Sequence, residues 1–465
     1  MAQRSDSHGV EQQLQGAFRR GAVLDLRSHA PDQDEPVSRS SWGPERQIHA
    51  DAIAELLLDS TKPAAGKTAV LHLIGARIIG KLSLRYSTID YPVIIEDCFF
   101  DEPIDFSYLH AVSLSLTGSQ IPSVSGYSLR VDGDLDCISI MTTSIDIFGA
   151  RVGGRFWLNG AHLFGCDGRR TLNAPDISVD GGMYCHGLTA TGGVNIFGAT
   201  IGATLEFDGA TLTNPTGYAL RAPGLTVKSD MTCTDGFTAT GEIDLSDAHI
   251  DGQLILAAAT VSDVIADLRG ANIRALRGES SDWPDRLRLN ELSYDSLQPY
   301  LPATQQLLWL KRDPDGYLPQ PYEQLATTYR KLGHDEQARI VLLAKQRHRR
   351  KNLHPPAKVW GYVQDASIGY GYRPTRAFAW LAILVIVTAI YFAAHPPHAV
   401  NSAAGPRFQP VIYALDILLP ILDLGQEKAH TTTGMGQWVT WLIMLFGWIL
   451  ATAVIAGVTR ILTRT

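Results

Sequence analysis

Two acidic side chains, Asp416 and Asp423, lie in a short apolar segment near the end of the chain. They are seven residues apart, so they share one helical face if Pro420 only kinks the helix. In a symmetric oligomer, a ring of such carboxylates would attract cations and line a pore. The alternative is the tip of an amphipathic hairpin, with both acids facing water. Segment 411–425 is therefore a candidate pore or interface region, with Asp416, Pro420, Asp423 and the adjacent Glu427 as its candidate residues.

Two uncharged apolar runs, residues 377–394 and 438–459, flank this segment. A helix of about 17–25 residues crosses a hydrocarbon core of about 30 Å, so each run is long enough, the first with little to spare. A soluble helix of that length would carry a polar stripe, and neither run has one. The runs predict a two-helix transmembrane hairpin within a membrane module at residues 359–465. Segment 411–425 is too short and too interrupted to span, so we expect it to be interfacial or re-entrant.

Positive charge gathers on one side of the two runs. A cluster of six basic residues, followed by Arg373 and Arg376, precedes the first run. Arg460 and Arg464 follow the second, and only Arg407 and Lys428 lie between the runs. Because basic residues stay cytoplasmic, we expect a multi-pass plasma-membrane protein with both termini in the cytoplasm. Anionic lipid headgroups would attract the six residues by about 1 kcal/mol each. This predicted lipid-contacting cluster consists of Lys345, Arg347, Arg349, Arg350, Lys351 and Lys358.

Composition narrows the function classes. The net charge of −7 is modest, and beyond the basic cluster there is no patch that predicts nucleic-acid binding. Residues 1–30 contain no apolar run of the signal-peptide type. The five cysteines form no metal-like pair, and Cys185 beside His186 is the only adjacent cysteine–histidine pair. We therefore predict neither a metal site nor a cofactor site.

The N-terminal half is repetitive. Three blocks, VDGDLDC, VDGGMYC and VKSDMTC, end at Cys137, Cys185 and Cys233, with spacings of 48 and 48 residues. The unit Ala-x-(Ile/Val/Leu)-x-x, often followed by Gly, resembles a degenerate pentapeptide repeat. Strand-like alternation predicts two coils of about 24 residues per block, stacked at about 4.8 Å. Residues 66–279 are thus expected to form a right-handed β-solenoid, mainly β, with the three cysteines as an internal ladder.

Both ends of a solenoid need covers, because open coils expose strand edges. Residues 48–59 have helix-like apolar spacing, so we expect a helical cap within residues 1–65. Residues 280–358 are expected to form a helical connector with one tetratricopeptide-like hairpin. We interpret this hairpin as a second cap, with a partner-binding groove as the alternative. Its pattern is carried by Leu325, Tyr329, Leu332, Gly333 and Ala338.

Five stretches of the chain together resemble one actinobacterial family of membrane-anchored proteins with degenerate pentapeptide-like repeats. They are WGPERQIHADAIAELLL, the GAxIxGxLxL units, DPDGYLPQPYEQLATTYRKLGHDEQAR, LDILLPILDLGQE and GWILATAVIAGVTR. The resemblance covers essentially the whole chain. Members are often labelled "membrane-associated oxidoreductase", so the resemblance implies a membrane location and a redox activity. The sequence has no dinucleotide fingerprint, redox dithiol or haem motif, and no catalytic residue carries over.

Three functions follow from these features. We expect a non-enzymatic membrane scaffold, in which a cytoplasmic solenoid presents one face to an unknown protein partner. The repeat and the lack of a convergent catalytic set in the sequence motivate this hypothesis. The alternative is a homo-oligomeric ion channel or membrane-perturbing effector that uses segment 411–425. The third is an oxidoreductase, as the family label suggests.

Overall fold

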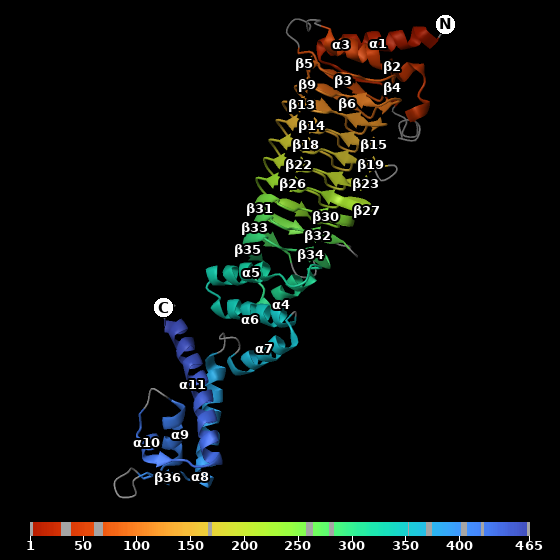
Figure 1. The fold of residues 1–465 in the computed structure, drawn as a ribbon. Helices are drawn as coiled ribbons and strands as arrows, with labels where there is room; N and C mark the ends of the chain where they lie inside the picture. Colours follow the sequence, from red (N-terminus) through yellow and green to blue (C-terminus); the bar gives the residue numbers. More distant parts are fainter. Residues whose placement is uncertain are drawn as a thin grey trace. The chain divides into compact units, whose positions relative to one another are not determined.

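The chain forms two compact units, Met1–Ala338 and Arg339–Thr465. The first contains a β-solenoid of about ten turns, and the second is a helical region (Figure 1). The computed structural model describes residues 3–28, 39–59, 68–165, 170–256, 264–278, 283–351, 353–368, 374–400, 407–419 and 423–462.

A typical solenoid coil contains four parallel strands of two residues each. In one coil they are β10 (Leu114–Ser115), β11 (Gln120–Ile121), β12 (Val124–Ser125) and β13 (Arg130–Val131). Each strand pairs in register with its counterpart in the next coil. Among the described residues, the pairings assemble a 19-stranded and a 16-stranded sheet. Neighbouring coils therefore satisfy one another's backbone hydrogen-bonding groups.

The strands fall into four columns along the solenoid. The first holds β3 (Leu71–Ile74), β6 (Val93–Glu96), β10, β14 (Leu135–Asp136), β18 (Phe156–Trp157), β22 (Met183–Tyr184), β26 (Leu205–Glu206) and β29 (Met231–Cys233). The second holds β4 (Arg77–Ile79), β7 (Phe99–Phe100), β11, β15 (Met141–Thr142), β19 (His162–Phe164) and β23 (Thr189–Thr191). The third holds β8 (Ile104–Asp105), β12, β16 (Ile145–Asp146), β20 (Leu172–Asn173), β24 (Val194–Asn195), β32 (Ile265–Asp267) and β34 (Arg286–Arg288). The fourth holds β5 (Thr88–Ile89), β9 (His110–Ala111), β13, β17 (Arg151–Val152), β21 (Ser178–Val179), β25 (Thr200–Ile201) and β28 (Thr226–Val227).

Longer strands take over in the last coils. The second and third columns merge in β27 (Thr211–Arg221) and β30 (Thr238–Asp244). The fourth and first columns continue in β31 (His249–Leu256), β33 (Asn272–Arg277) and β35 (Ser293–Gln298). Parallel pairing thus continues beyond residue 279, where we expected the solenoid to end.

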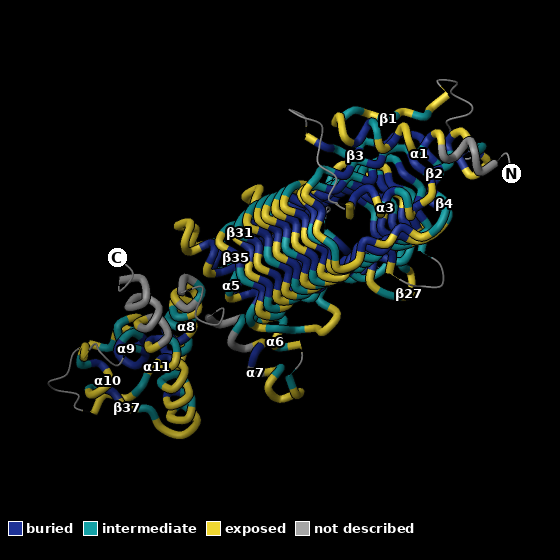
Figure 2. The backbone as a smooth tube through the Cα atoms, turned by 90° about the horizontal axis from the view of Figure 1, so that it is seen from above, coloured by how far each residue is buried: buried dark blue, intermediate teal, exposed yellow. Residues whose placement is uncertain are grey.

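Buried positions within a coil recur at alternating spacings of two and three residues. This gives two inward side chains in every five residues, which explains the pentapeptide-like pattern of the sequence. One longer step, from Val131 to Leu135, closes the coil. Figure 2 shows the buried interior of the coils between exposed outer positions. The inward positions of one coil are Leu114, Leu116, Ser119, Ile121, Val124, Gly126, Leu129 and Val131.

The coils are not of equal length. Leu114 pairs with Leu135 and Leu135 pairs with Phe156, so each of these coils takes 21 residues. Phe156 pairs with Met183, so the next coil takes 27. The additional residues of the long coil lie between β19 and β20. The uniform coil of about 24 residues was therefore wrong, because the 48-residue repeat combines a short coil with a long one.

Cys137, Cys185 and Cys233 lie in one internal column, at 3%, 0% and 0% exposure. They do not stack directly on one another, because Leu158 and Phe207 occupy the same position in the intervening coils. The predicted cysteine ladder is therefore an alternating one. Burial raises the pKa of all three thiols, and the nearby charge of Asp136, Glu206 or Asp208 adds to this effect. Cys166 lies outside the described residues.

A thiol reagent at pH 8 is expected to leave the folded solenoid essentially unlabelled in a Cys166→Ser chain. Burial excludes the reagent, and a raised pKa leaves little of the reactive thiolate. Burial also raises the pKa of Cys98, to about 12. Denaturant should release all four thiols, as counted by absorbance. A matched Thr200→Cys variant, at an exposed position, should react at once; rapid labelling without the added cysteine would contradict the assignment.

Helices and short strands cover the N-terminal end of the solenoid. Helix α3 (Ala50–Leu58) agrees with the helix expected at 48–59, and α1 (Gln3–Arg20) was not predicted. Strands β1 (Val23–Asp25) and β2 (Gln47–His49) extend the two sheets by pairing with β3 and β4. The single-turn helices η1 (Arg39–Ser41) and η2 (Pro44–Arg46) precede β2. Buried side chains of α1 and α3 face this end: Leu14, Phe18, Ile53 and Leu57.

Helix α5 (Pro319–Lys331) caps the opposite end, after α4 (Ala303–Trp309) and η3 (Leu310–Arg312). The Nε2 of Gln324 donates to the carbonyl of Tyr294 at 2.6 Å, and that of Gln320 to Leu292 at 3.0 Å. Side chains of α5 thus satisfy carbonyls of the last coil, which is the role expected of a cap. Gly333, with φ +77°, separates α5 from α6 (Asp335–Lys351).

The second unit begins within α6, and its described residues then form further helices and a small two-stranded sheet. Helix α9 packs against both α8 and α11, and its Tyr413 and Ile417 form a core with Phe392 of α8. The elements are α7 (Pro355–Ile368), α8 (Pro374–Ala394), β36 (His398–Ala399), α9 (Pro410–Leu418), α10 (Gln426–Ala429), β37 (His430–Thr431) and α11 (Met435–Leu462).

Among the described residues, one helix is long and apolar enough to cross a membrane. It is α11, through its segment Met435–Thr452, of which only 17% is buried. The described apolar part of α8, Phe378–Ala394, is shorter than the spanning segment of α11. The described residues therefore form a C-terminal helical region with one helix of spanning length, where the sequence predicted a hairpin of two.

Candidate functional site

The predicted pore region is divided between two short helices. Helix α9 ends at Leu418, so Asp416 and Asp423 do not share a helical face as expected. Asp416 is buried, and its two carboxylate oxygens accept hydrogen bonds from the backbone N–H groups of Leu424, at 2.6 Å, and Glu427, at 2.7 Å. This carboxylate is thereby tied to the turn that starts α10. Pro420 lies outside the described residues.

The other two acids of this region differ in environment. Asp423 is exposed, accepts a hydrogen bond from the backbone of Gly425 and forms an ion pair with Lys428. Its pairing with Lys428 lowers the pKa of Asp423. Burial, followed by the negative charge of Asp416, raises the pKa of Glu427. The structure thus brings Asp416 and Glu427 together and leaves Asp423 in a separate, exposed pair.

Two members of the predicted lipid-contacting cluster are held within the protein. Arg347 and Arg350 pair with Asp365 of α7 at 2.9 and 3.2 Å, and Arg350 also lies 3.9 Å from the ring centre of Tyr362. Burial alone would raise the pKa of Asp365. The hydrogen bonds and positive charge of the two arginines outweigh this effect, so the pKa is lowered. Arg349 and Lys351 are exposed, and Lys345 and Lys358 are half-buried.

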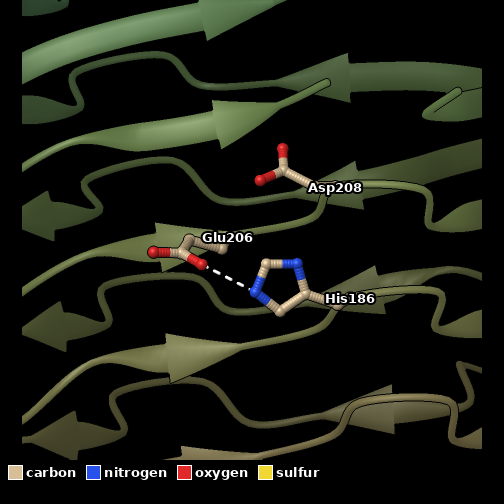
Figure 3. A group of neighbouring side chains, drawn as sticks. All are labelled: His186, Glu206 and Asp208. Atoms are coloured by element: carbon tan, nitrogen blue, oxygen red, sulfur yellow. Dashed lines mark ion pairs between the residues drawn. The ribbon is translucent and has the colours of Figure 1, made fainter. Parts of the chain in front are cut away.

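A group that sequence reasoning missed lies on the outer surface of the solenoid. His186, Glu206 and Asp208 each offer one ligand atom, and these atoms lie within 4.8 Å of one another. Figure 3 shows the three side chains, with the ion pair between His186 Nε2 and Glu206 Oε2 at 2.7 Å. All three are half-buried. Cys185, which precedes His186 in the sequence, is fully buried in the core and does not belong to this group.

The backbone ladder positions these side chains. The N–H of Cys185 donates to the carbonyl of Glu206 at 2.7 Å, and the N–H of Gly187 donates to Asp208 at 2.9 Å. The residues on either side of His186 are therefore bonded to the coil that carries both acids. Sequence spacing alone does not predict this group, because coil lengths vary. The length of the coil that follows His186 decides that residue 186 lies beside residues 206 and 208.

The described surface also has two hollows. One, of about 820 Å³, lies between α1 and α3 and is lined by acidic, amide and apolar side chains, including Glu11, Asp51 and Glu55. The other is small and lies beside Trp283 and Trp309. Neither lining includes a cysteine, serine or histidine. The His186 group is therefore the better candidate for chemistry.

No protein-family model, curated protein or solved structure matched the chain. The fold defines the chain as a β-solenoid protein with a C-terminal helical region. The resemblance to the actinobacterial family stays a prediction that rests on the quoted motifs.

Proposed function

We propose that the chain is a non-enzymatic, membrane-anchored scaffold of the plasma membrane that presents its solenoid to a protein partner in the cytoplasm. The exposed apolar surface of α11 carries this proposal. Large contiguous apolar surfaces are rare on soluble proteins and mark contacts with membranes or other proteins. The strongly exposed apolar residues of α11 include Trp438, Trp441, Leu442, Leu445, Phe446 and Trp448.

We extend the proposal to a hairpin in which α8 also crosses the bilayer. Helix α8 has 21 residues, and its outer surface is likewise apolar and exposed at Trp380, Ile386 and Ile390. It packs along α11 (Figure 1), and β36 pairs antiparallel with β37, which joins the ends of the two helices. The apolar parts of the two helices contain no ionised side chain, so lipid could cover both surfaces without burying a charge.

Scaffolding fits a solenoid whose interior is filled by side chains. Its outer surface is long and regular, and such surfaces in repeat proteins commonly bind partners. The right-handed winding and the contact of the basic cluster with anionic lipid remain predictions. The channel alternative also remains a prediction, although the ties of Asp416 to backbone N–H groups do not favour a pore-facing carboxylate. The oxidoreductase hypothesis rests on the family label alone.

Full-length protein in isolated membranes is expected to stay in the pellet after alkaline carbonate washing and to dissolve in mild detergent. Leu445→Asp should increase the carbonate-released fraction, because a carboxylate at the centre of a spanning helix costs about 2.5–3.5 kcal/mol. The matched variant Phe164→Asp changes an equally apolar, exposed residue of the solenoid and should leave retention unchanged. Release of the unaltered protein by carbonate would reject the anchor. Catalytic turnover that a point substitution abolishes would reject the non-enzymatic scaffold.

A further inference from the structure

We propose that His186, Glu206 and Asp208 form a binding site for a divalent transition-metal ion of the zinc type. One imidazole and two carboxylates are ligands that such ions accept. The site lies on the outside of the solenoid and does not depend on the scaffold or membrane proposals.

The spacing of the ligand atoms suits one ion. Zinc binds imidazole nitrogen and carboxylate oxygen at about 2.0–2.2 Å, so two ligand atoms on one ion lie within about 4.4 Å of each other. The three atoms here lie within 4.8 Å of one another, and the closest two are 2.7 Å apart. Small rotations of side chains therefore suffice to place all three around one ion. The hydrogen-bonded backbone of adjacent coils keeps their Cα atoms fixed.

The negative charge of the two carboxylates also favours binding of a cation. In the described chain, neither Glu206 nor Asp208 forms an ion pair with a lysine or an arginine. Asp208 instead accepts hydrogen bonds from neutral donors: the hydroxyl of Thr232 at 2.9 Å, and the N–H and hydroxyl of Thr234 at 2.8 and 2.7 Å. These bonds orient the carboxylate without neutralising it, as outer partners of metal ligands do.

Other histidine–carboxylate pairs on the solenoid lack these features. His110 pairs with Asp132 at 2.9 Å, His249 with Asp251 at 2.8 Å, and His72 with Glu96 at 3.6 Å. Asp251 also pairs with Lys228, which supplies the positive charge. Among the described residues, only His186 belongs to a group of three ligand atoms of this kind. An ordinary surface ion pair explains these other pairs. Beside His186 and Glu206, Asp208 adds a second carboxylate whose hydrogen-bond donors in the described chain are all neutral.

Three protein ligands leave at least one coordination position for water or for a side chain of a bound partner. The site is open to solvent, since 41% of the His186 side chain is exposed. The imidazole favours zinc-type ions over calcium and magnesium, which bind through oxygen alone. Binding of Zn²⁺ with negligible response to Ca²⁺ is thus the expected selectivity.

Titration calorimetry of the chelator-treated, full-length protein in mild detergent tests the proposal, with Zn²⁺ alone as the probe. His186→Gln and Asp208→Asn should each weaken Zn²⁺ binding by about tenfold or more. His110→Gln is the matched control, because it removes a solenoid imidazole from a pair without a third ligand. In Co²⁺-loaded protein, the visible absorption band should disappear in the first two variants and persist in the control.

Thermal unfolding distinguishes ligand loss from misfolding. Without metal, the three variants should unfold near the temperature of the unaltered chain, and added Zn²⁺ should raise that temperature only where the site is intact. Equal Zn²⁺ affinity of His186→Gln, Asp208→Asn and the unaltered chain would overturn the proposal. An equal loss in His110→Gln would overturn it as well, because binding would then lack a defined site.

Discussion

Replacing Phe207 by alanine is expected to lower the free energy of unfolding of the solenoid by about 3–5 kcal/mol. The ring is fully buried and occupies the internal column between Cys185 and Cys233. Removing it leaves a cavity, and the coils cannot collapse into that space because hydrogen bonds to both neighbouring coils fix their spacing. Loss of the β-sheet circular dichroism signal with denaturant measures the effect.

Phe197→Ala provides the matched control. It removes the same side chain ten residues earlier, at a position that is 41% exposed. Its cost should stay within about 0.5 kcal/mol, the usual range for surface substitutions. If the two variants unfold at the same denaturant concentration, the inward and outward assignment of this coil is wrong.

Gly447→Leu is expected to disrupt the helical unit. A Cβ at this position would lie 2.7–2.9 Å from Leu418, in contact with its Cα, carbonyl oxygen and side chain. Backbone atoms cannot move aside as a flexible side chain can, so α9 must leave its place against α11. Overpacking of this kind costs about 1–3 kcal/mol and sometimes more. Limited proteolysis and thermal unfolding in mild detergent should both show a less stable unit.

Gly436→Leu serves as the control on the same helix. Its Cβ would meet only the Thr432 side chain, at 3.6 Å, which is an ordinary contact distance. This variant should resemble the unaltered protein in both assays. Unchanged stability of Gly447→Leu would show that α9 does not pack closely on α11.

Much of the solenoid could be predicted from the sequence because inward positions are nearly all apolar or small. The repeat of Cys137, Cys185 and Cys233 marked the period of two coils correctly. It could not show that one coil is short and the next long, because the additional residues of the long coil lie outside the repeated core positions. Helix α1 was missed because its apolar residues, Val10, Leu14, Ala17 and Phe18, are few among many polar ones.

The candidate sites were harder to predict, because they depend on which residues meet across the chain. Asp416 and Asp423 were assigned to one helical face by their spacing, but α9 ends between them and Asp416 bonds to the turn beyond. To predict the group of His186, Glu206 and Asp208, one must know the length of the coil between His186 and the two acids. With the register of Tyr184 against Glu206 known, the same sequence places His186 near two carboxylates.

Labelling of single cysteines from outside intact cells tests the central claim, a two-helix anchor with a cytoplasmic solenoid. The buried native thiols give a low background once Cys166 is replaced by serine. Val400→Cys lies in the exposed connection between α8 and α11, and Thr200→Cys lies on the solenoid surface. With a membrane-impermeant maleimide, we expect Val400→Cys to react in intact cells and Thr200→Cys to react only after permeabilisation. If Val400→Cys also requires permeabilisation, α8 does not cross the membrane and the two-helix anchor is wrong.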